Sequence, residues 1–437
     1  MSLSTEATAA LTEASVLYRQ HAPISAVLHS MQSMGSNWLD WDAQEAFLKR
    51  VLLSAPALKF PPSTRYTVSL LRAYTEKVQA GAVEDVSDGL FGYLAELQPN
   101  GHATSGFLSF DLPSVDLPPR SRETTLAVRV EPQHNEVGLR MWEAGFLLTE
   151  YCLQRPEAVR GRSVVELGAG LGLTGMAAAV CCGAARVVLT DCAADVLENM
   201  ADSLSRNGIS HCEGNSAVEG PGRSDRCCPL EVIELDWMAG GAAALNSLRA
   251  EKGADCTTET RKSSTSIDSS DSNHLDSNGS KKNTTIADEN YVVLAADVLY
   301  DPTVVPHFVN VVEALLKGSP SSCSADSNTP MMATSKAQNP SDQARQKKCN
   351  KAVVLVAATL RNPGTLQLFL DEVSRREIPL LESSFRWSSD SDPSRALKVA
   401  GGAGPSPFHF DPTSVRLFAL GGEPDDGSHD DWTPITD

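Results

Sequence analysis

The stretch Ser163-Val164-Val165-Glu166-Leu167-Gly168-Ala169-Gly170-Leu171-Gly172-Leu173-Thr174-Gly175 decides the fold of this 437-residue chain. A β-branched run ends in a cluster of glycines, and a helix of small residues, predicted from Met176 to Val180, follows at once. A strand, a glycine turn and a helix form the seat for a cofactor in α/β sheets. Glycine tolerates positive φ and a close approach of the backbone to a ligand, and free N–H groups at the helix start point into the site.

Two cofactors fit these glycines. Gly170-x-Gly172-x-x-Gly175 matches the dinucleotide fingerprint of dehydrogenases, and Glu166-x-Gly168-x-Gly170-x-Gly172 matches the acidic-glycine motif of S-adenosylmethionine enzymes. Glu166 favours the second cofactor, because the first strand of a dinucleotide fold is apolar at this position. A structural alternative is that Glu166 pairs with a buried base. Asp191 closes the next strand, 21 residues after Gly170, and can accept the ribose hydroxyls of either cofactor.

The elements around this stretch alternate as in a doubly wound α/β sheet with an antiparallel edge. A helix over 141–153 precedes the first strand. The pattern predicts strands at 163–167, 186–191, 231–235, 291–297 and 351–359, helices at 194–207, 304–317 and 363–375, and a closing antiparallel pair at 385–387 and 414–420.

Composition divides the chain further. We expect a smaller helical N-terminal domain, a linker with a hairpin, the cofactor-binding domain and an acidic tail, at 1–100, 101–132, 133–420 and 421–437. Two polar low-complexity segments, 257–287 and 318–348, interrupt the third of these. Neither contains enough apolar surface to offset the entropy of ordering it, so we expect both to loop out as mobile inserts.

Two further strand ends carry candidate site residues. Asp236 and Trp237 follow the third strand, where an acid can bond an adenine amino group and an indole can cover the ring. A packing tryptophan beside a surface aspartate fits the spacing equally well. Asp297 and Tyr300 end the fourth strand beside the crevice where such sheets bind ligands, and together they could position an amine. The alternative is a helix-capping aspartate followed by a core tyrosine.

Charge and cysteine usage exclude several classes of protein. The net charge of −18 argues against a general nucleic-acid binder. No apolar run is long enough for a membrane span, and the first thirty residues lack the pattern of a signal peptide. The ten cysteines include no Cys-x-x-Cys pair, so we expect reduced thiols and no metal site. We therefore expect a monomeric protein in the cytoplasm.

Trp142, the glycine loop, Leu235-Asp-Trp237 and Asp297-Val-Leu-Tyr300 together resemble the seven-strand protein-lysine methyltransferases with the Asp-x-x-Tyr motif. Two more segments, Lys59-Phe-Pro-Pro-Ser-Thr-Arg-Tyr66 and Thr359-Leu-Arg-Asn-Pro-Gly-Thr-Leu-Gln-Leu-Phe369, are similar to the branch of that family that methylates eukaryotic elongation factor 2. The resemblance covers residues 38–98 and 135–420 without the two inserts. It departs from the family at Ser203, where the family has Asn.

The resemblance implies a seven-strand Rossmann-like sheet, S-adenosylmethionine as cofactor and a lysine of elongation factor 2 as methyl acceptor. It implies that Asp297 accepts a hydrogen bond from the lysine and that Tyr300 shapes its channel, while residues 1–100 dock the substrate. The residues on the cofactor side are then Trp142, Glu166, Gly168, Gly170, Asp191, Trp237 and Ala296. Two alternatives stay open: a methyltransferase of this fold with another protein or a small molecule as substrate, and a non-catalytic binding protein.

Overall fold

The computed structural model describes most of the chain outside the two low-complexity segments. The predicted inserts 257–287 and 318–348 lie outside the described residues, apart from Gly318. The described residues are 4–81, 85–100, 105–113, 123–131, 137–213, 216–218, 230–241, 243, 291–318, 352–386, 398–399, 402–403 and 406–435.

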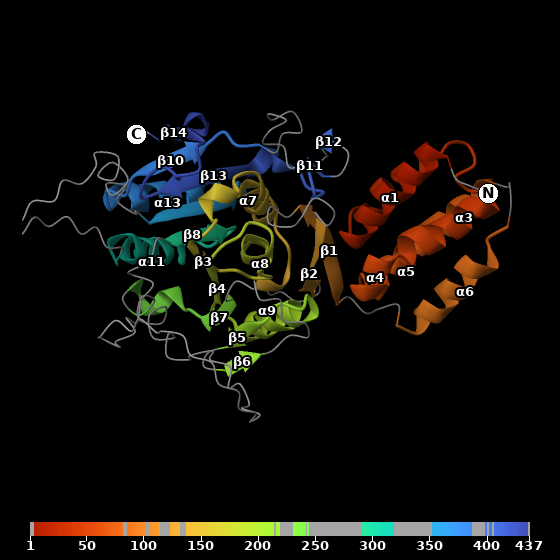
Figure 1. The fold of residues 1–437 in the computed structure, drawn as a ribbon, viewed down its shortest axis with the longest axis horizontal. Coiled ribbons are helices and arrows are strands. Elements are labelled where there is room, and N and C mark those ends of the chain that lie inside the picture. The colour runs from red at the N-terminus through yellow and green to blue at the C-terminus, as the bar shows by residue number, and fades with distance from the viewer. Residues whose placement is uncertain are drawn as a thin grey trace, which may run out of the picture.

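A mixed sheet of ten described strands forms the centre of the protein, in the order β14-β10-β13-β9-β8-β3-β4-β7-β5-β6 (Figure 1). The run from β9 to β5 is parallel, and β13, β10, β14 and β6 are antiparallel to their neighbours. The strands are β3 (Ser163–Leu167), β4 (Arg186–Asp191), β5 (His211–Glu213), β6 (Ser216–Val218), β7 (Leu230–Glu234), β8 (Tyr291–Ala296), β9 (Val353–Thr359), β10 (Leu380–Ser383), β13 (Val415–Leu420) and β14 (Trp432–Pro434).

This architecture confirms the α/β class with a mostly parallel sheet and an antiparallel edge. The predicted count of seven strands is too low for the described sheet, because three short strands, β5, β6 and β14, extend its two edges. The chain order reverses at β3, which pairs with β4 on one side and β8 on the other. Such a switch point opens a crevice at the carboxyl ends of the strands.

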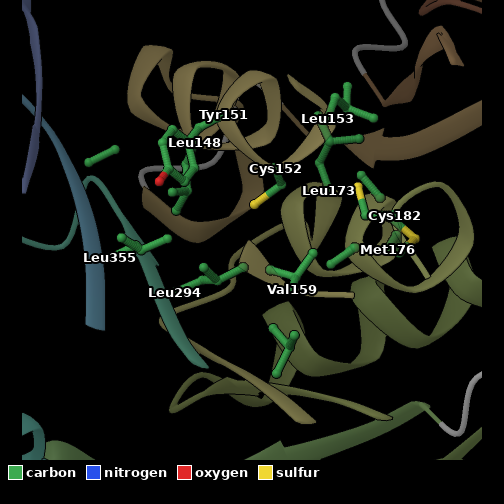
Figure 2. Close-up of a cluster of buried hydrophobic side chains, with 14 of the residues drawn as sticks. Leu148, Tyr151, Cys152, Leu153, Val159, Leu173, Met176, Cys182, Leu294 and Leu355 are labelled. Carbon is green, nitrogen blue, oxygen red and sulfur yellow. The ribbon is translucent and has the colours of Figure 1, made fainter. Parts of the chain in front are cut away.

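Helices cover both faces of the sheet, and the strand residues alternate between the two resulting cores. Val164, Leu294 and Leu355 face one core, whereas Val165 and Val293 face the other. Figure 2 shows the first core, where Leu148 and Cys152 approach the sheet. This face is covered by α7 (Glu143–Gln154), α8 (Leu173–Val180) and α9 (Ala194–Arg206), and the opposite face by α11 (Val305–Gly318) and α13 (Pro363–Arg375).

The N-terminal helices form a separate group with an apolar core of their own, beside the sheet (Figure 1). A hairpin lies between them and the sheet. Its strands β1 (Gly106–Pro113) and β2 (Glu123–Val130) pair antiparallel, and buried Arg19 forms an ion pair with Asp111 of β1. The helices are α1 (Thr5–Arg19), α2 (Ile24–Gln32), α3 (Trp41–Phe47), α4 (Ala55–Lys59), α5 (Thr64–Gly81) and α6 (Asp88–Leu97), with a π-helical turn at Leu48–Leu52.

Ser203 of α9 and Asn207, which caps the end of this helix, hold the hairpin against the helix. Ser203 Oγ accepts a hydrogen bond from the backbone N–H of Arg129, at 3.0 Å. Asn207 pairs with both backbone groups of Ala127, at 2.9 and 2.6 Å. Ser203, the position that departs from the family pattern, therefore serves the attachment of β2 to α9.

The closing edge differs from the prediction. The strand expected at 385–387 is instead β10, at Leu380–Ser383. Phe385 packs edge-on against Tyr151 of α7, with ring centroids 5.2 Å apart, so it is a core residue outside the ladder. Trp387 lies outside the described residues.

The acidic segment 421–437 was predicted as a tail from its charge, but its described part, residues 421–435, packs onto the sheet. β14 pairs with β10, and Trp432 is buried with its Nε1 donating to Ser428 Oγ at 3.0 Å. Asp426 is also buried and accepts a hydrogen bond from the Tyr151 hydroxyl. The segment thus contributes a buried indole and a hydrogen-bonded buried carboxylate to the fold, which its charge alone did not indicate.

Candidate active site

The predicted site residues surround one cavity of about 350 Å³, at the carboxyl ends of the central strands. The switch point between β4, β3 and β8 forms its floor. The cavity is lined by every residue predicted for the site, which are Trp142, Glu166, Gly168, Gly170, Asp191, Trp237, Ala296, Asp297 and Tyr300.

The glycine loop forms a cradle that side chains would fill. Gly168, Gly170 and Gly172 have φ values of +64°, +53° and +74°, which disfavour any other residue. A Cβ at Gly168 would lie 3.1 Å from the Trp237 ring. A Cβ at Gly175 would lie 2.7 Å from Glu166 Oε2 and 2.2 Å from Leu189. The loop therefore leaves backbone, rather than side chains, facing the cavity, as a tightly held cofactor requires.

Glu166 is buried at the end of β3 and fixes the start of α8. Its Oε2 accepts from the backbone N–H of Gly175 at 2.8 Å. Burial raises the pKa of Glu166 to about 8, against the hydrogen bonds from Gly175 N–H and the Thr174 hydroxyl, and nearby Asp191 adds to the rise. Its partners among the described residues are a backbone N–H and a hydroxyl, so the alternative of a buried basic partner is wrong.

Asp191 ties the glycine loop to the first turn of α9. Its carboxylate accepts from the backbone N–H groups of Gly170, Cys192 and Ala193, at 3.1, 2.8 and 3.3 Å. Burial raises the pKa of Asp191, and the three N–H groups oppose that rise. The carboxylate keeps acceptor capacity toward the cavity, since a carboxylate has about four acceptor positions.

Asp236 and Trp237 both line the cavity and both have structural contacts. Asp236 accepts from Met238 N–H at 2.8 Å and caps a 3-10 turn, Trp237–Ala239, and its place in the cavity lining is compatible with the predicted bond to adenine as well. Trp237 packs against Phe308, with ring centroids 5.3 Å apart, and also lines the cavity. The indole is therefore both a packing residue and a wall of the site.

Asp297 follows β8 and is bonded to the neighbouring strand. It has a φ of +54°, and it is almost fully buried. Oδ1 accepts from the backbone N–H of Thr359 at 2.9 Å, and Oδ2 accepts from the Thr359 hydroxyl at 2.9 Å and from Arg361 at 3.1 Å. Asp297 caps no helix, because α11 begins only at Val305.

Tyr300 lines the cavity with 52% of its surface exposed, so the core-tyrosine alternative is wrong. Partial burial raises the pKa of its hydroxyl, and the charges of Asp191, Cys192 and Asp301 add to the rise. Tyr300 therefore remains a neutral phenol over the physiological range and presents a hydrogen-bonding edge to the cavity.

Three polar residues outside the cavity lining form a hydrogen-bonded network with Asp297 and were not predicted: Glu143, Thr359 and Arg361. Arg361 donates to Glu143 Oε2 at 2.9 Å and to Asp297, and its guanidinium carbon lies 4.6 Å from the Trp142 ring centroid. A signal existed in the sequence, since β9 ends at Thr359 and the carboxyl ends of parallel neighbours meet at one edge of a sheet.

No group of three or more His, Cys, Asp or Glu side chains among the described residues could hold a metal ion.

Comparison with known proteins assigns the chain to a class. A family model described as lysine methyltransferase matches residues 121–218, which include the glycine loop and Asp191. Protein-lysine N-methyltransferase EEF2KMT of Homo sapiens is 27% identical over 322 residues, covering 74% of this chain and 73% of the relative. Its Bos taurus counterpart is 27% identical over 336 residues, covering 76% and 77%. EFM3 of Chaetomium thermophilum is 24% identical over 395 residues, covering 87% and 90%.

The matching family model and these relatives support a protein-lysine methyltransferase, and methyltransferases of the matching kind use S-adenosylmethionine generally. Within this class the chain is similar to EEF2KMT, which confirms the resemblance stated from its motifs. The glycine loop therefore belongs to a methyltransferase and not to a dehydrogenase. No described helix is long and apolar enough to cross a membrane.

Proposed function

We propose that this enzyme transfers a methyl group from S-adenosylmethionine to a lysine of eukaryotic elongation factor 2, acting as a monomer in the cytoplasm. The observation that carries the proposal is the meeting of the glycine loop, Asp191 and the Asp297–Tyr300 segment on one cavity wall. The names of the relatives, EEF2KMT among them, support elongation factor 2 as the substrate.

The cavity suits the proposed cofactor. The backbone of Gly168 and Gly170 would lie against it, Asp191 would accept from the ribose hydroxyls, and Glu166 would face its positive end. Further contacts would come from the Trp142 and Trp237 rings and from Ala296. When bound, S-adenosylmethionine supplies a methyl group on a positively charged sulfur, which an amine attacks with its lone pair while the sulfur keeps the electrons of the broken bond.

The acceptor side must present a neutral amine in line with that methyl group. A lysine of pKa near 10.4 is mostly protonated at pH 7, and removing its proton costs about 4–5 kcal/mol. Asp297 would accept a hydrogen bond from the amine and orient its lone pair, while the proton leaves for water. The Tyr300 edge would confine the side chain. Most of the catalysis is then alignment, with little acid–base chemistry.

Exposed apolar side chains at the mouth of the cavity support a protein substrate. Val137, Met238 and Tyr300 line the cavity and are exposed, and Leu360 lies beside Arg361. The N-terminal helices, which we propose to dock the substrate, expose Trp41, Leu58 and Phe91 on their surface. Exposed large apolar groups of this kind are typical of protein-binding surfaces.

Labelling of a whole extract tests the proposed substrate. We expect the purified enzyme and methyl-labelled S-adenosylmethionine to label one main band, of the size of elongation factor 2, in cytosol from cells that lack this enzyme. Cytosol from cells that retain the enzyme is the control. The acceptor lysine is already methylated there, so labelling should be weak. A main band of another size, or label only in small molecules, would favour a different substrate for the same site.

A further inference from the structure

Arg361 contacts the wall of the active site from outside the cavity. It joins Trp142 and Asp297, which line the cavity, to Glu143, which does not. The Arg361 side chain is 41% exposed and that of Glu143 is 43% exposed, whereas that of Asp297 is 7% exposed. The guanidinium therefore lies at the boundary between the solvent and the buried carboxylate of the site.

The groups around this guanidinium form a general cation site. An aromatic face attracts any cation within about 6 Å of its centroid, and charge-assisted hydrogen bonds to carboxylates bind guanidinium and ammonium groups alike. A lysine side chain carries the same charge on a flexible four-carbon stem with three donors. Trp142, Glu143 and Asp297 could therefore hold a lysine ammonium in place of the Arg361 guanidinium.

Arg361 and an incoming lysine would compete for these groups. Asp297 already accepts three hydrogen bonds, two from Thr359 and one from Arg361, and a carboxylate has about four acceptor positions. The bond to Arg361 is the one made to a cation, and it also pairs the charge of the carboxylate. An ammonium arriving with Arg361 in place would find the charge of Asp297 already neutralised.

We propose that Arg361 is an internal stand-in for the methyl-accepting lysine. It holds the cation site formed by the Trp142 ring and the carboxylates of Glu143 and Asp297, and the substrate ammonium takes this site when Arg361 swings into solvent. The inference rests on the proposed function, because it assigns the cation site to the substrate lysine. Arg361 lies in a bend after β9, and its ion pair with Glu143 is exposed on both sides and therefore weak, so the pair with Asp297 is the main one that an incoming ammonium must replace.

Binding of n-butylammonium, a minimal lysine side chain, tests the competition in the full-length protein. Ligand-observed NMR would measure its affinity for the wild type and for Arg361→Met, which keeps an unbranched stem without the charge. We expect the variant to bind n-butylammonium at least about tenfold more tightly. In the wild type Arg361 occupies the site in most molecules, and the apparent affinity equals the intrinsic affinity multiplied by the fraction of molecules whose site is free. Adding Asp297→Asn to Arg361→Met should abolish the gain, and Arg375→Met, at an exposed arginine of α13 paired with Glu372, should leave affinity unchanged.

Steady-state kinetics with elongation factor 2 give a second readout. A stand-in predicts a lower KM for Arg361→Met with kcat maintained, whereas a residue that only positions Asp297 predicts a lower kcat at unchanged KM. Calorimetry with S-adenosylmethionine verifies that each variant is folded. If Arg361→Met is not folded, Arg361→Gln takes its place. Equal or weaker butylammonium binding in the variant, or the loss of kcat alone, overturns the proposal. If the wild type leaves elongation factor 2 unmodified, the proposed substrate is wrong, and the butylammonium experiment still decides the cation site.

Discussion

Replacing Asp297 with alanine should lower kcat/KM for the protein substrate by about 100-fold or more, which is the usual effect of removing a group that orients the reacting centre. In the proposed reaction the carboxylate accepts a hydrogen bond from the amine, and its orientation is fixed by the two bonds from Thr359. Affinity for S-adenosylmethionine should stay near that of the wild type. Initial rates with labelled cofactor, together with calorimetry, measure both quantities.

The alanine variant also loses stability, since it leaves the partly buried Thr359 N–H without its acceptor, at a cost of up to about 1–3 kcal/mol. Asp297→Asn therefore accompanies it, because the amide keeps an acceptor for that N–H but carries no charge. Asp301→Ala is the matched control: it removes a carboxylate that, among the described residues, bonds Thr303 of its own turn and lies outside the cavity lining. Near-normal methylation by both Asp297 variants would exclude the proposed role.

Replacing Glu166 with glutamine should weaken S-adenosylmethionine binding by about tenfold at pH 8.5 and remove its pH dependence below that value, because each pKa unit of coupling corresponds to a factor of ten in affinity. The pKa of Glu166 is about 8 in the free protein, so the group is mostly protonated at neutral pH. A positively charged ligand favours its ionised form and lowers that pKa. At low pH, binding must displace the proton on Glu166, which weakens it. Wild-type affinity should therefore rise from about pH 6 to about pH 8.5, as Glu166 loses this proton before the ligand binds.

The stability of the protein should also depend on the titration of Glu166. The pKa of Glu166 is raised from 4.5 to about 8 on folding, so the folded state holds more protons than the unfolded state between these values. The free energy of unfolding should therefore fall as pH rises through this window, and Glu166→Gln should remove that fall. In the binding measurements, titration of the amino group of S-adenosylmethionine affects the wild type and Glu166→Gln equally. Asp195→Asn, in the first turn of α9 and outside the cavity lining, is the matched control. A variant with wild-type affinity and pH dependence would exclude Glu166 from the site.

The central sheet could be predicted because its strands are nearly continuous apolar runs between turn residues. Buried parallel strands such as β3 and β8 must be apolar on both faces, which is a strong local signal. The site followed from topology, since Glu166, Asp191 and Asp297 each lie at or beside a strand end on one edge. Polar residues at three strand ends are brought together by the sheet itself.

The remaining features depend on pairings between distant segments. β14 is three residues long within an acidic segment, and only the burial of Trp432 against the sheet makes it a strand. Arg361 lies two residues beyond β9, and its position depends on Trp142 and Glu143 more than two hundred residues earlier. Local periodicity contains no information about such contacts.

Transfer to purified elongation factor 2 tests the central claim most directly. The enzyme, methyl-labelled S-adenosylmethionine and the factor are incubated together, and tandem mass spectrometry locates the label. We predict methylation of a lysine ε-nitrogen, present with the wild type and strongly reduced with Asp297→Asn. Normal binding of S-adenosylmethionine without label on the factor, or label on a residue other than lysine, would contradict the proposal.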